Sequence, residues 1–438
     1  MIRRRGKTTN KGWFGRRARN TNRQASRPRG LRLEPLEQRT LLTTFFVETG
    51  GDLQDAIDDA AANAGADTVV IATGTYSGNF ETDDSDPLTI RGIGKVTIEG
   101  DDDGEHAIKI RGGGDVTIEN VTITGGKDGI NAKKGNLTLV DVNVLETGDE
   151  GVQAEKMGSV SITGGNITEN AGDGIKVDGG DLILVDVDVR GNGDEGVQAE
   201  EMDSVSITGG NITENAGDGI KVDGGDLILV NVDVRENGDE GVQAKEMDSV
   251  SITGGNFNGN DDDGIKVETT DFVTIEDVSV KDNGGDGIDL EEIGSIIVTN
   301  VVVSGNGDEG LEVDDSGTVL VDGGKFSDNA DEGIDIDNSG VIIVMNVDVS
   351  GNGGSGLQVE GDDGDFPVTS VTISNSSFTD NAGDGIQIVE DGDGSIGDVT
   401  LTSIKTSDND ESGLEIDISG TLITTDVKSD DNGEADTL

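Results

Sequence analysis

The chain of 438 residues has no cysteine and one histidine, which excludes disulfides, thiolate metal sites and histidine-rich zinc sites. Its net charge of −59 is unevenly divided: residues 1–40 hold 13 lysines and arginines against two glutamates, so they carry +11 and the rest of the chain carries −70. A polyanion of that size repels nucleic acid and attracts cations. We therefore expect no nucleic-acid partner, and without a run of 18 apolar residues we expect no membrane span.

Residues 1–44 are predicted to be a basic, disordered targeting segment, because they are polar and lack hydrophobic periodicity. Residues 33–42 read LEPLEQRTLL. This stretch resembles the LEPR-XLL motif at the N-termini of large bacterial proteins, which is thought to act in export to the cell surface. The resemblance implies an extracellular or cell-surface location in a bacterium.

Residues 45–127 are predicted to form an N-terminal cap helix and the first coils of a repeat. Apolar residues recur at helical spacing from Asp52 to Ala64, with Asp52 as the N-cap, and short β-rich runs follow. We expect the helix to cover the exposed edge of the first coil. The order of helix, VVIATGTY, LTIRG and VTIEG resembles the opening of right-handed parallel β-helix proteins of the pectin-lyase-like superfamily.

Residues 128–438 are predicted to be regular β-helix repeats. Gly151–Glu195 and Gly196–Glu240 are copies of one 45-residue unit that differ at four positions, and each copy divides into halves of 22 to 23 residues. An acidic residue or serine, then glycine, then an aliphatic residue recurs thirteen times. The pattern predicts an all-β fold, a single-stranded right-handed parallel β-helix with three short strands per coil and glycine at the corners.

Stacked coils place equivalent residues in columns along one axis. One column is apolar from Ile130 to Leu414, so we assign it to the core, together with Phe257, Phe326 and Phe378. A second column is asparagine, and we expect it to form a structural ladder of amide hydrogen bonds. Its members are Asn170, Asn192, Asn215, Asn237, Asn260, Asn283, Asn306, Asn329, Asn352, Asn381, Asn409 and Asn432.

The acidic residues before the glycines form a column of like charges about 5 Å apart, where each neighbouring pair costs about 1 kcal/mol in water. Two remedies remain open. A high-salt habitat screens the charges, since the Debye length is about 3 Å at 1 M salt. Alternatively, Ca²⁺ binds carboxylate and carbonyl oxygens at the turns.

The column two positions after the glycine changes sign along the chain. It alternates glutamine and lysine as far as Lys266 and then becomes acidic in three successive coils. We predict Ca²⁺ ligands among the carboxylates of these coils, namely Asp286, Asp289, Glu309, Glu312, Glu332 and Asp335. Longer coils follow, with insertions at 360–366 and 390–397. Their Asp362, Asp363, Asp391 and Asp393 are predicted as further Ca²⁺ ligands, or else as parts of solvated loops.

The resemblance to the pectin-lyase-like superfamily also implies a catalytic alternative. In its polysaccharide lyases, Ca²⁺ on carboxylates neutralises a uronate while a nearby lysine or arginine removes a proton. Lys266 beside Asp289 is the candidate for that role, although no arginine neighbours it. The single histidine, His106, is interpreted as a surface residue of an early coil.

Two hypotheses about function follow. The first is a secreted or cell-surface, non-catalytic protein that binds Ca²⁺ and extracellular polysaccharide, because duplicated units extend a passive surface better than they extend one active site. The second is a Ca²⁺-dependent polysaccharide lyase, or another glycan-active enzyme, that uses Lys266. At the C-terminal edge, either acidic repulsion protects the last coil or another chain or domain stacks on it.

Overall fold

The computed structural model describes residues 42–101, 104–361, 367–390 and 394–438. The predicted targeting segment and its LEPLEQRTLL motif therefore lie outside the described residues, apart from the last few positions of the segment. Among the described residues, no helix is long and apolar enough to cross a membrane.

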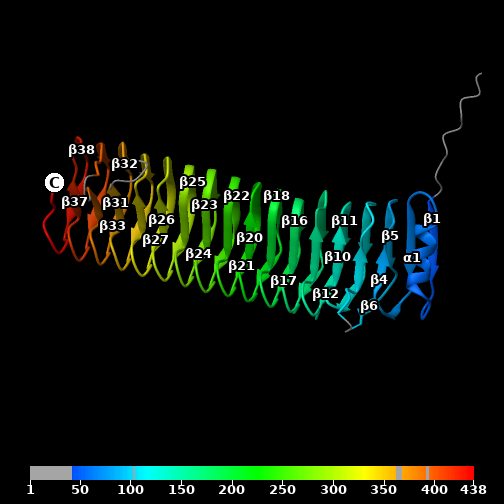
Figure 1. Ribbon diagram of the computed structural model, residues 1–438. Coiled ribbons are helices and arrows are strands. Elements are labelled where there is room, and N and C mark those ends of the chain that lie inside the picture. The colour runs from blue at the N-terminus through cyan, green and yellow to red at the C-terminus, as the bar shows by residue number, and fades with distance from the viewer. Residues whose placement is uncertain (1–41, 102–103, 362–366, 391–393) are drawn as a thin grey trace, which may run out of the picture. The chain divides into compact units, whose positions relative to one another are not determined.

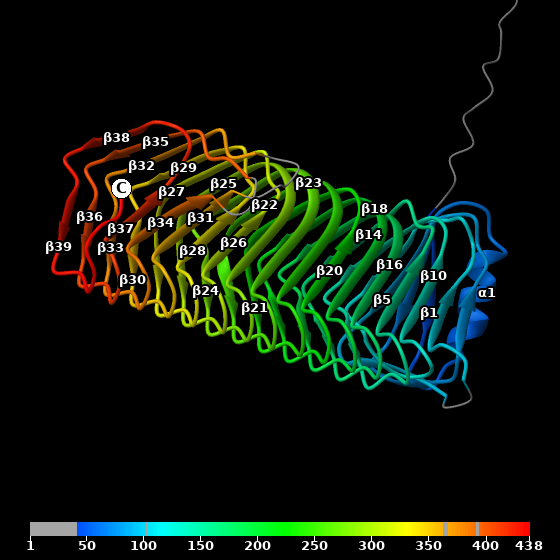
Figure 2. The ribbon, with the colours of Figure 1, turned by 60° about the vertical axis from the view of Figure 1, so that its left-hand side comes forward.

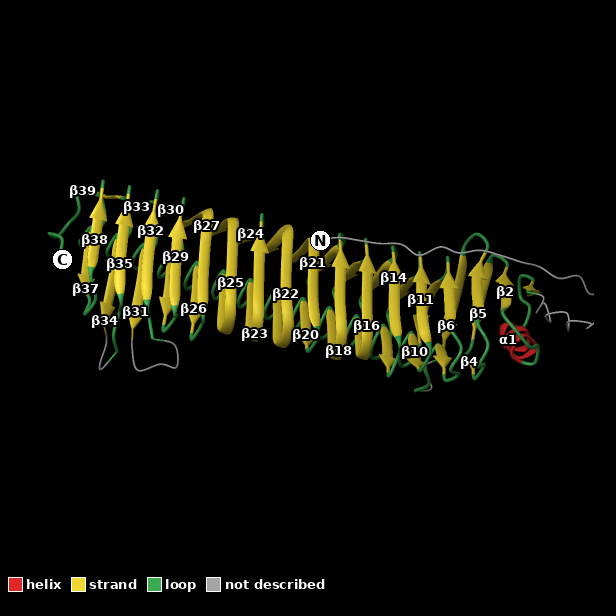
Figure 3. Ribbon diagram, turned by 90° about the horizontal axis from the view of Figure 1, so that it is seen from above, coloured by secondary structure: helices red, strands yellow, loops and turns green. Residues whose placement is uncertain are grey.

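The described strands form a parallel β-helix, as predicted. Apart from the strands of the first and last coils, each strand pairs in parallel with its counterpart one coil earlier and one coil later. Figure 1 shows the coils stacked along one axis from β1 to β38. Viewed from above, the strands lie side by side in one continuous series (Figure 3).

Each regular coil contributes a first, a second and a third strand. Separate first strands are β4 (Phe80–Thr82), β7 (Ile108–Ile110), β10 (Ile130–Lys133), β13 (Val152–Glu155), β20 (Ile220–Asp223), β26 (Leu311–Asp314), β28 (Ile334–Asp337), β31 (Leu357–Gly361), β34 (Ile386–Glu390) and β37 (Leu414–Asp417). Separate second strands are β1 (Thr43–Val47), β2 (Asp67–Ile71), β5 (Leu88–Gly92), β8 (Val116–Glu119), β11 (Asn136–Val140), β14 (Ser159–Thr163), β29 (Val341–Met345), β32 (Ser370–Ser374), β35 (Asp398–Thr402) and β38 (Leu422–Thr425). Separate third strands are β3 (Gly74–Ser77), β6 (Val96–Gly100), β9 (Thr122–Gly125), β12 (Asn143–Leu145), β15 (Asn166–Thr168), β17 (Asp188–Arg190), β19 (Asn211–Thr213), β24 (Ser279–Lys281), β30 (Asp348–Ser350), β33 (Ser377–Thr379), β36 (Lys405–Ser407) and β39 (Lys428–Asp430).

In the middle of the chain the strands run on through corners, so not every coil has three short strands. First and second strands are continuous in β16 (Ile175–Val185), β18 (Val197–Thr208) and β23 (Ile265–Glu276), and second and third strands in β21 (Asp226–Arg235) and β27 (Thr318–Ser327). All three are continuous in β22 (Val242–Asn258) and β25 (Ile288–Ser304).

The corner between the second and third strands begins with a residue in the left-handed conformation. Glycine was expected there, and Gly209 (φ 63°) is one case, but Asp186 (φ 51°) and Asn231 (φ 51°) occupy the same position in neighbouring coils. Aspartate and asparagine adopt this conformation more readily than other residues with a side chain, because their short polar groups can hydrogen-bond locally. Glycine is therefore one of several residue types at this corner, which also include serine at Ser403 (φ 56°).

The core consists of the inward-facing columns, and its register is the predicted one. Ile220 pairs with Val242, and the column continues without a shift from Ile130 to Leu414. Phe257, Phe326 and Phe378 are fully buried, as predicted. Each buried aliphatic or aromatic side chain contributes about 1.5–3 kcal/mol of hydrophobic stabilisation.

The asparagine ladder is confirmed at every rung. Each asparagine from Asn170 to Asn409 donates its Nδ2 to Oδ1 of the next one along the axis, at 2.9–3.0 Å. The same Oδ1 also accepts the backbone N–H of the preceding asparagine, as Asn237 does from Asn215 at 3.2 Å. The ladder therefore satisfies buried polar groups at the corner that precedes each first strand.

The helix α1 (Leu53–Ala61) is shorter than the predicted span, and it begins as expected, with Asp52 accepting the backbone N–H of Asp55 at 3.1 Å. Its buried Leu53, Ile57 and Ala60 join the core, and it packs against β1, β2 and β4. Figure 2 shows it beside β1 at the N-terminal end of the coils. Its role as a cap stays a prediction.

Candidate metal-binding face

The outward side of the first strands, here called the first-strand face, brings the predicted site residues together. Two columns define it: the corner column, which is the residue before each glycine, and the middle column, which is the residue two positions after that glycine. In the middle column Lys266 pairs with Asp289, which is followed by Glu312 and Asp335 in the next coils. The alignment inferred from the repeat is therefore the alignment in the fold.

Carboxylate oxygens from neighbouring coils converge on this face in five groups of three. Within each group one oxygen from each residue lies within 4.8 Å of the others. The groups are Asp128, Asp149 and Glu150; Asp173, Asp194 and Glu195; Asp263, Asp286 and Asp289; Asp286, Glu309 and Glu312; and Glu309, Glu332 and Asp335.

Three of the five groups contain a lysine that supplies the positive charge. Lys127 Nζ lies 3.5 Å from Asp128 and 3.0 Å from Asp149 in the first group. In the second group Asp173 pairs with Lys176 at 3.1 Å and Glu195 with Lys221 at 3.2 Å. In the third group Lys266 pairs with both Asp263 and Asp289. These lysines offset the charge of the carboxylates around them.

The two remaining groups have no lysine or arginine in any ion pair formed by the described residues. Burial raises the pKa of Asp286 to about 10, and side-chain hydrogen bonds to Glu309 and Glu312 add to the shift. Burial also raises the pKa of Glu312 and of Glu332 to about 7. Without a cation these carboxyl groups are therefore harder to ionise than ordinary ones.

Asp335 is the clearest case of a carboxyl group that is hard to ionise without a cation. Burial, followed by the charges of Asp337 and Glu332, raises its pKa to about 9. Gln358 Nε2 donates to its Oδ2 at 3.3 Å, whereas its Oδ1 is buried and accepts no hydrogen bond within the described part of the chain. A buried oxygen without a donor, beside two further carboxylates, fits a hard cation that takes oxygen ligands.

Lys266 lies at the border between the two kinds of group. Burial lowers its pKa, but the hydrogen bond and charge of Asp289 and the charge of Asp263 raise it by more, so the net shift is upward. The shift favours the ammonium form, whereas a general base must be neutral. The surroundings of Lys266 therefore suit an ion pair better than proton abstraction.

The remaining predicted ligands, Asp362, Asp363, Asp391 and Asp393, lie outside the described residues. β31 and β34, the strands that precede them in the chain, pair in the expected register.

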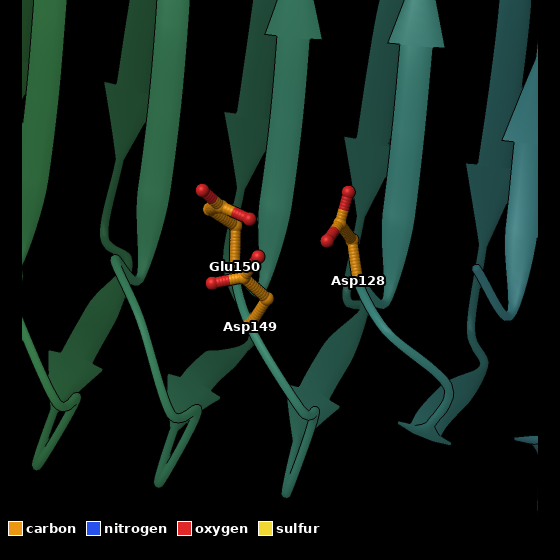
Figure 4. Close-up of side chains that lie close together, drawn as sticks. All are labelled: Asp128, Asp149 and Glu150. Carbon is orange, nitrogen blue, oxygen red and sulfur yellow. The ribbon is translucent and has the colours of Figure 1, made fainter. Parts of the chain in front are cut away.

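The first of the five groups contains residues that the sequence did not single out (Figure 4). Asp128 is fully buried, and its Oδ2 lies 2.8 Å from Nδ1 of His106 and accepts a 2.8 Å hydrogen bond from Asn131. The side chain of His106 is 14% exposed, so this residue is partly buried against Asp128 and less exposed than the sequence suggested. Burial is the largest influence on His106 and lowers its pKa. The signal available in the sequence was the position of Asp128 at the start of the corner column.

These features define the class of protein: a right-handed parallel β-helix with an acidic first-strand face. The family described as "Right handed beta helix region" matches the chain at residues 106–254, 195–344, 240–396 and 332–436. The chain belongs to that family. A search of curated proteins gives no match.

Several solved structures have a similar backbone. The A-module of the mannuronan C-5 epimerase AlgE4 from Azotobacter vinelandii is 18% identical, with 88% of this chain and 92% of that chain covered and a TM-score of 0.37. A double mutant of the periplasmic alginate epimerase AlgG is 14% identical, with coverage of 76% and 78% and a TM-score of 0.42. Tailspike protein 3 of bacteriophage CBA120 is 12% identical, with coverage of 85% and 56% and a TM-score of 0.37. Similarity at this level carries no argument about activity.

Proposed function

We propose that this protein is a secreted or cell-surface, non-catalytic β-helix that binds Ca²⁺ on its first-strand face and holds acidic extracellular polysaccharide through the bound ions. The observation that carries the proposal is the presence of two clusters of three carboxylates that have no lysine partner. Their members are Asp286, Glu309, Glu312, Glu332 and Asp335, with Glu309 in both clusters. Four of these carboxyl groups have raised pKa values, those of Asp286, Glu312, Glu332 and Asp335. Together with the buried Oδ1 of Asp335, they favour a cation at the same place.

The lysine pattern explains why these coils differ from the earlier ones. Lysine recurs in the middle column at every second coil, at Lys176, Lys221 and Lys266, and the next place in that alternation is Glu312. Replacing an internal ammonium with a carboxylate removes a positive charge and adds an oxygen ligand. The change converts a self-neutralised stretch into one that requires an external cation.

A polysaccharide partner follows from the charge and the spacing. The face repels an anionic polymer until cations occupy it, whereas a bound Ca²⁺ can share its ligands between the protein and a uronate carboxylate. Coils about 4.8 Å apart present such ions along a line parallel to the axis. A linear acidic polymer can therefore contact several ions at once, and its affinity gains from multivalency.

A polysaccharide lyase remains the second candidate, because Lys266, Asp263 and Asp289 do lie together. The raised pKa of Lys266 counts against it. The proposal also keeps the domain assignment of targeting segment 1–44, cap and first coils 45–127 and repeats 128–438, with the LEPLEQRTLL motif directing export.

The test is calorimetric titration of Ca²⁺ into the full chain, with Mg²⁺ for comparison. We expect Glu312→Lys to lose Ca²⁺ binding in these coils and to melt at a higher temperature in EDTA, because it restores the lysine alternation. Asp203→Lys is the matched control, since Asp203 is exposed and belongs to none of the five groups. It makes the same change of charge and should keep the wild-type titration.

Two results of these measurements would refute parts of the proposal. Equal Ca²⁺ binding by wild type and Glu312→Lys would show that the two groups do not hold the ion. Ca²⁺ binding without retention of polygalacturonate on the protein would leave the metal site but remove the polysaccharide role.

A further inference from the structure

A second polar surface lies on the outward side of the third strands, here called the third-strand face. A groove of about 490 Å³ follows β15, β17, β19 and the end of β21. Guanidinium, amide and hydroxyl groups line it, from Asn166, Thr168, Arg190, Asn211, Thr213 and Arg235. The volume suits a small ligand or a segment of a polymer.

The groove contains the same set of side chains twice. Asn211, Thr213 and Arg235 each follow Asn166, Thr168 and Arg190 by 45 residues, the length of the duplicated unit. Thr168, Arg190, Thr213 and Arg235 are neighbours in one column, so the two arginines stand two coils apart, or about 9.6 Å. Two equivalent sets on one line suit a ligand that itself repeats along its length.

The two arginines differ in how they are paired. Arg190 donates to both carboxylate oxygens of Glu214, at 2.6–3.1 Å. At the equivalent position after Arg235 the chain has Gly259, so this partner is missing in the second set. The ion pair of Arg235 is with Asp233, whose Oδ2 lies 3.9 Å from the arginine Nη2. The Nε of Arg235 is buried and has no hydrogen-bond acceptor among the described residues. Arg235 therefore has donor capacity that the protein leaves unused.

The charges in the groove determine the class of ligand. Asp188, Glu214 and Glu236 also line it, so three carboxylates stand beside two guanidiniums in a strongly acidic protein. An anionic polymer is repelled here, and no apolar side chain is available to hold an apolar ligand. Neutral hydroxyls, by contrast, can donate to the carboxylates and accept from the guanidiniums, amides and threonines.

We propose that this groove binds a linear neutral polysaccharide that runs parallel to the β-helix axis, with the Arg190 and Arg235 sets as two equivalent subsites. Binding is direct and needs no metal ion. The site is separate from the first-strand face, so it adds a second kind of glycan contact to the proposed function and does not depend on it.

The experiment is calorimetric titration of the full chain, in EDTA, with neutral oligosaccharides from cellulose, laminarin and mannan. We expect at least one to bind, and we expect Arg235→Ala to weaken that binding about tenfold, because hydrogen bonds to a charged group are lost. Arg111→Ala is the control, since Arg111 is a similarly exposed arginine in an ion pair with Glu81, outside the groove. It should bind like wild type.

Three results would overturn the proposal. One is that none of the neutral oligosaccharides binds. Another is that Arg235→Ala and Arg111→Ala have the same effect. The third is that oligogalacturonate or a chitosan oligomer binds in EDTA more tightly than every neutral probe and is lost in Arg235→Ala, which would assign the groove to a charged ligand. Because EDTA removes free Ca²⁺, this titration measures only metal-independent binding. A negative result would therefore refute the groove site without bearing on the proposed Ca²⁺ site.

Discussion

At the scale of single residues, buried carboxylates on the first-strand face differ in whether a lysine neutralises them. Asp263 and Asp289 have Lys266, whereas Asp286 and Asp335 are in no ion pair among the described residues. Burial makes ionisation costly in both settings, and only a compensating positive charge offsets that cost. Residue identity at one middle-column position therefore decides whether a coil is self-neutralised or needs a cation.

Removing the ammonium group should expose this dependence. We expect Lys266→Ala to lower the free energy of unfolding at pH 7 by about 3 kcal/mol, because two largely buried carboxylates lose their ion pair. Urea unfolding measures the loss. The same variant tests the lyase alternative: formation of unsaturated product from uronic-acid polymers with Ca²⁺, lost in Lys266→Ala, would contradict the non-catalytic proposal.

Asp335 should make stability depend on pH. Its pKa is raised to about 9 in the folded chain, so its contribution is most favourable below the unfolded-state pKa of about 4 and is lost as pH rises toward 9. In EDTA we expect Asp335→Asn to be more stable than wild type at pH 8, by up to about 5 kcal/mol, and equal to it at pH 4. Urea unfolding at the two pH values checks this. A difference that does not change with pH would rule out the burial of a titrating carboxyl as the cause.

At the scale of elements, the asparagine ladder joins the corner of each coil to those above and below it. Each internal asparagine holds its neighbours through both side-chain and backbone groups, and each is almost fully buried. The ladder therefore fixes the corner from which each first strand starts, and with it the alignment of the first-strand face.

Truncating one rung should be costly. Asn237→Ala removes the hydrogen bonds to Asn215, Asn260 and the carbonyl of Ile212, and leaves buried donors and acceptors unpaired. We expect a loss of about 3 kcal/mol in the free energy of unfolding. Asn136→Ala, at a more exposed position on β11, is the control and should cost less than about 1 kcal/mol. Similar losses in both variants would show that the ladder has no special role.

At the scale of the whole molecule, stability is limited by repulsion between like charges repeated along the axis. The net charge is −59, and the acidic columns hold their members at the fixed spacing of the coils. Such repulsion weakens with ionic strength, and it weakens further when a divalent ion binds between neighbours. Salt and Ca²⁺ should therefore both raise the free energy of unfolding, salt by screening the charges and Ca²⁺ by binding between them.

The two routes can be separated by their concentration dependence. In EDTA we expect the melting temperature to rise as NaCl increases from low concentration to about 1 M, where the Debye length is about 3 Å. At low NaCl we expect millimolar Ca²⁺ to raise it as well, and to raise it less in Glu312→Lys. No rise from either addition would contradict the charge argument.

The sequence by itself determined the parallel β-helix, the apolar column from Ile130 to Leu414, the asparagine ladder and the run of acids after Lys266. It did so because the coil rise equals one strand spacing, so the repeat period alone decides which residues are neighbours along the axis. Only the tertiary structure decided which oxygens converge, that His106 lies partly buried against Asp128, and that the Nε of Arg235 has no acceptor among the described residues. These features depend on contacts between columns and on burial at each turn, and a period along the chain specifies neither.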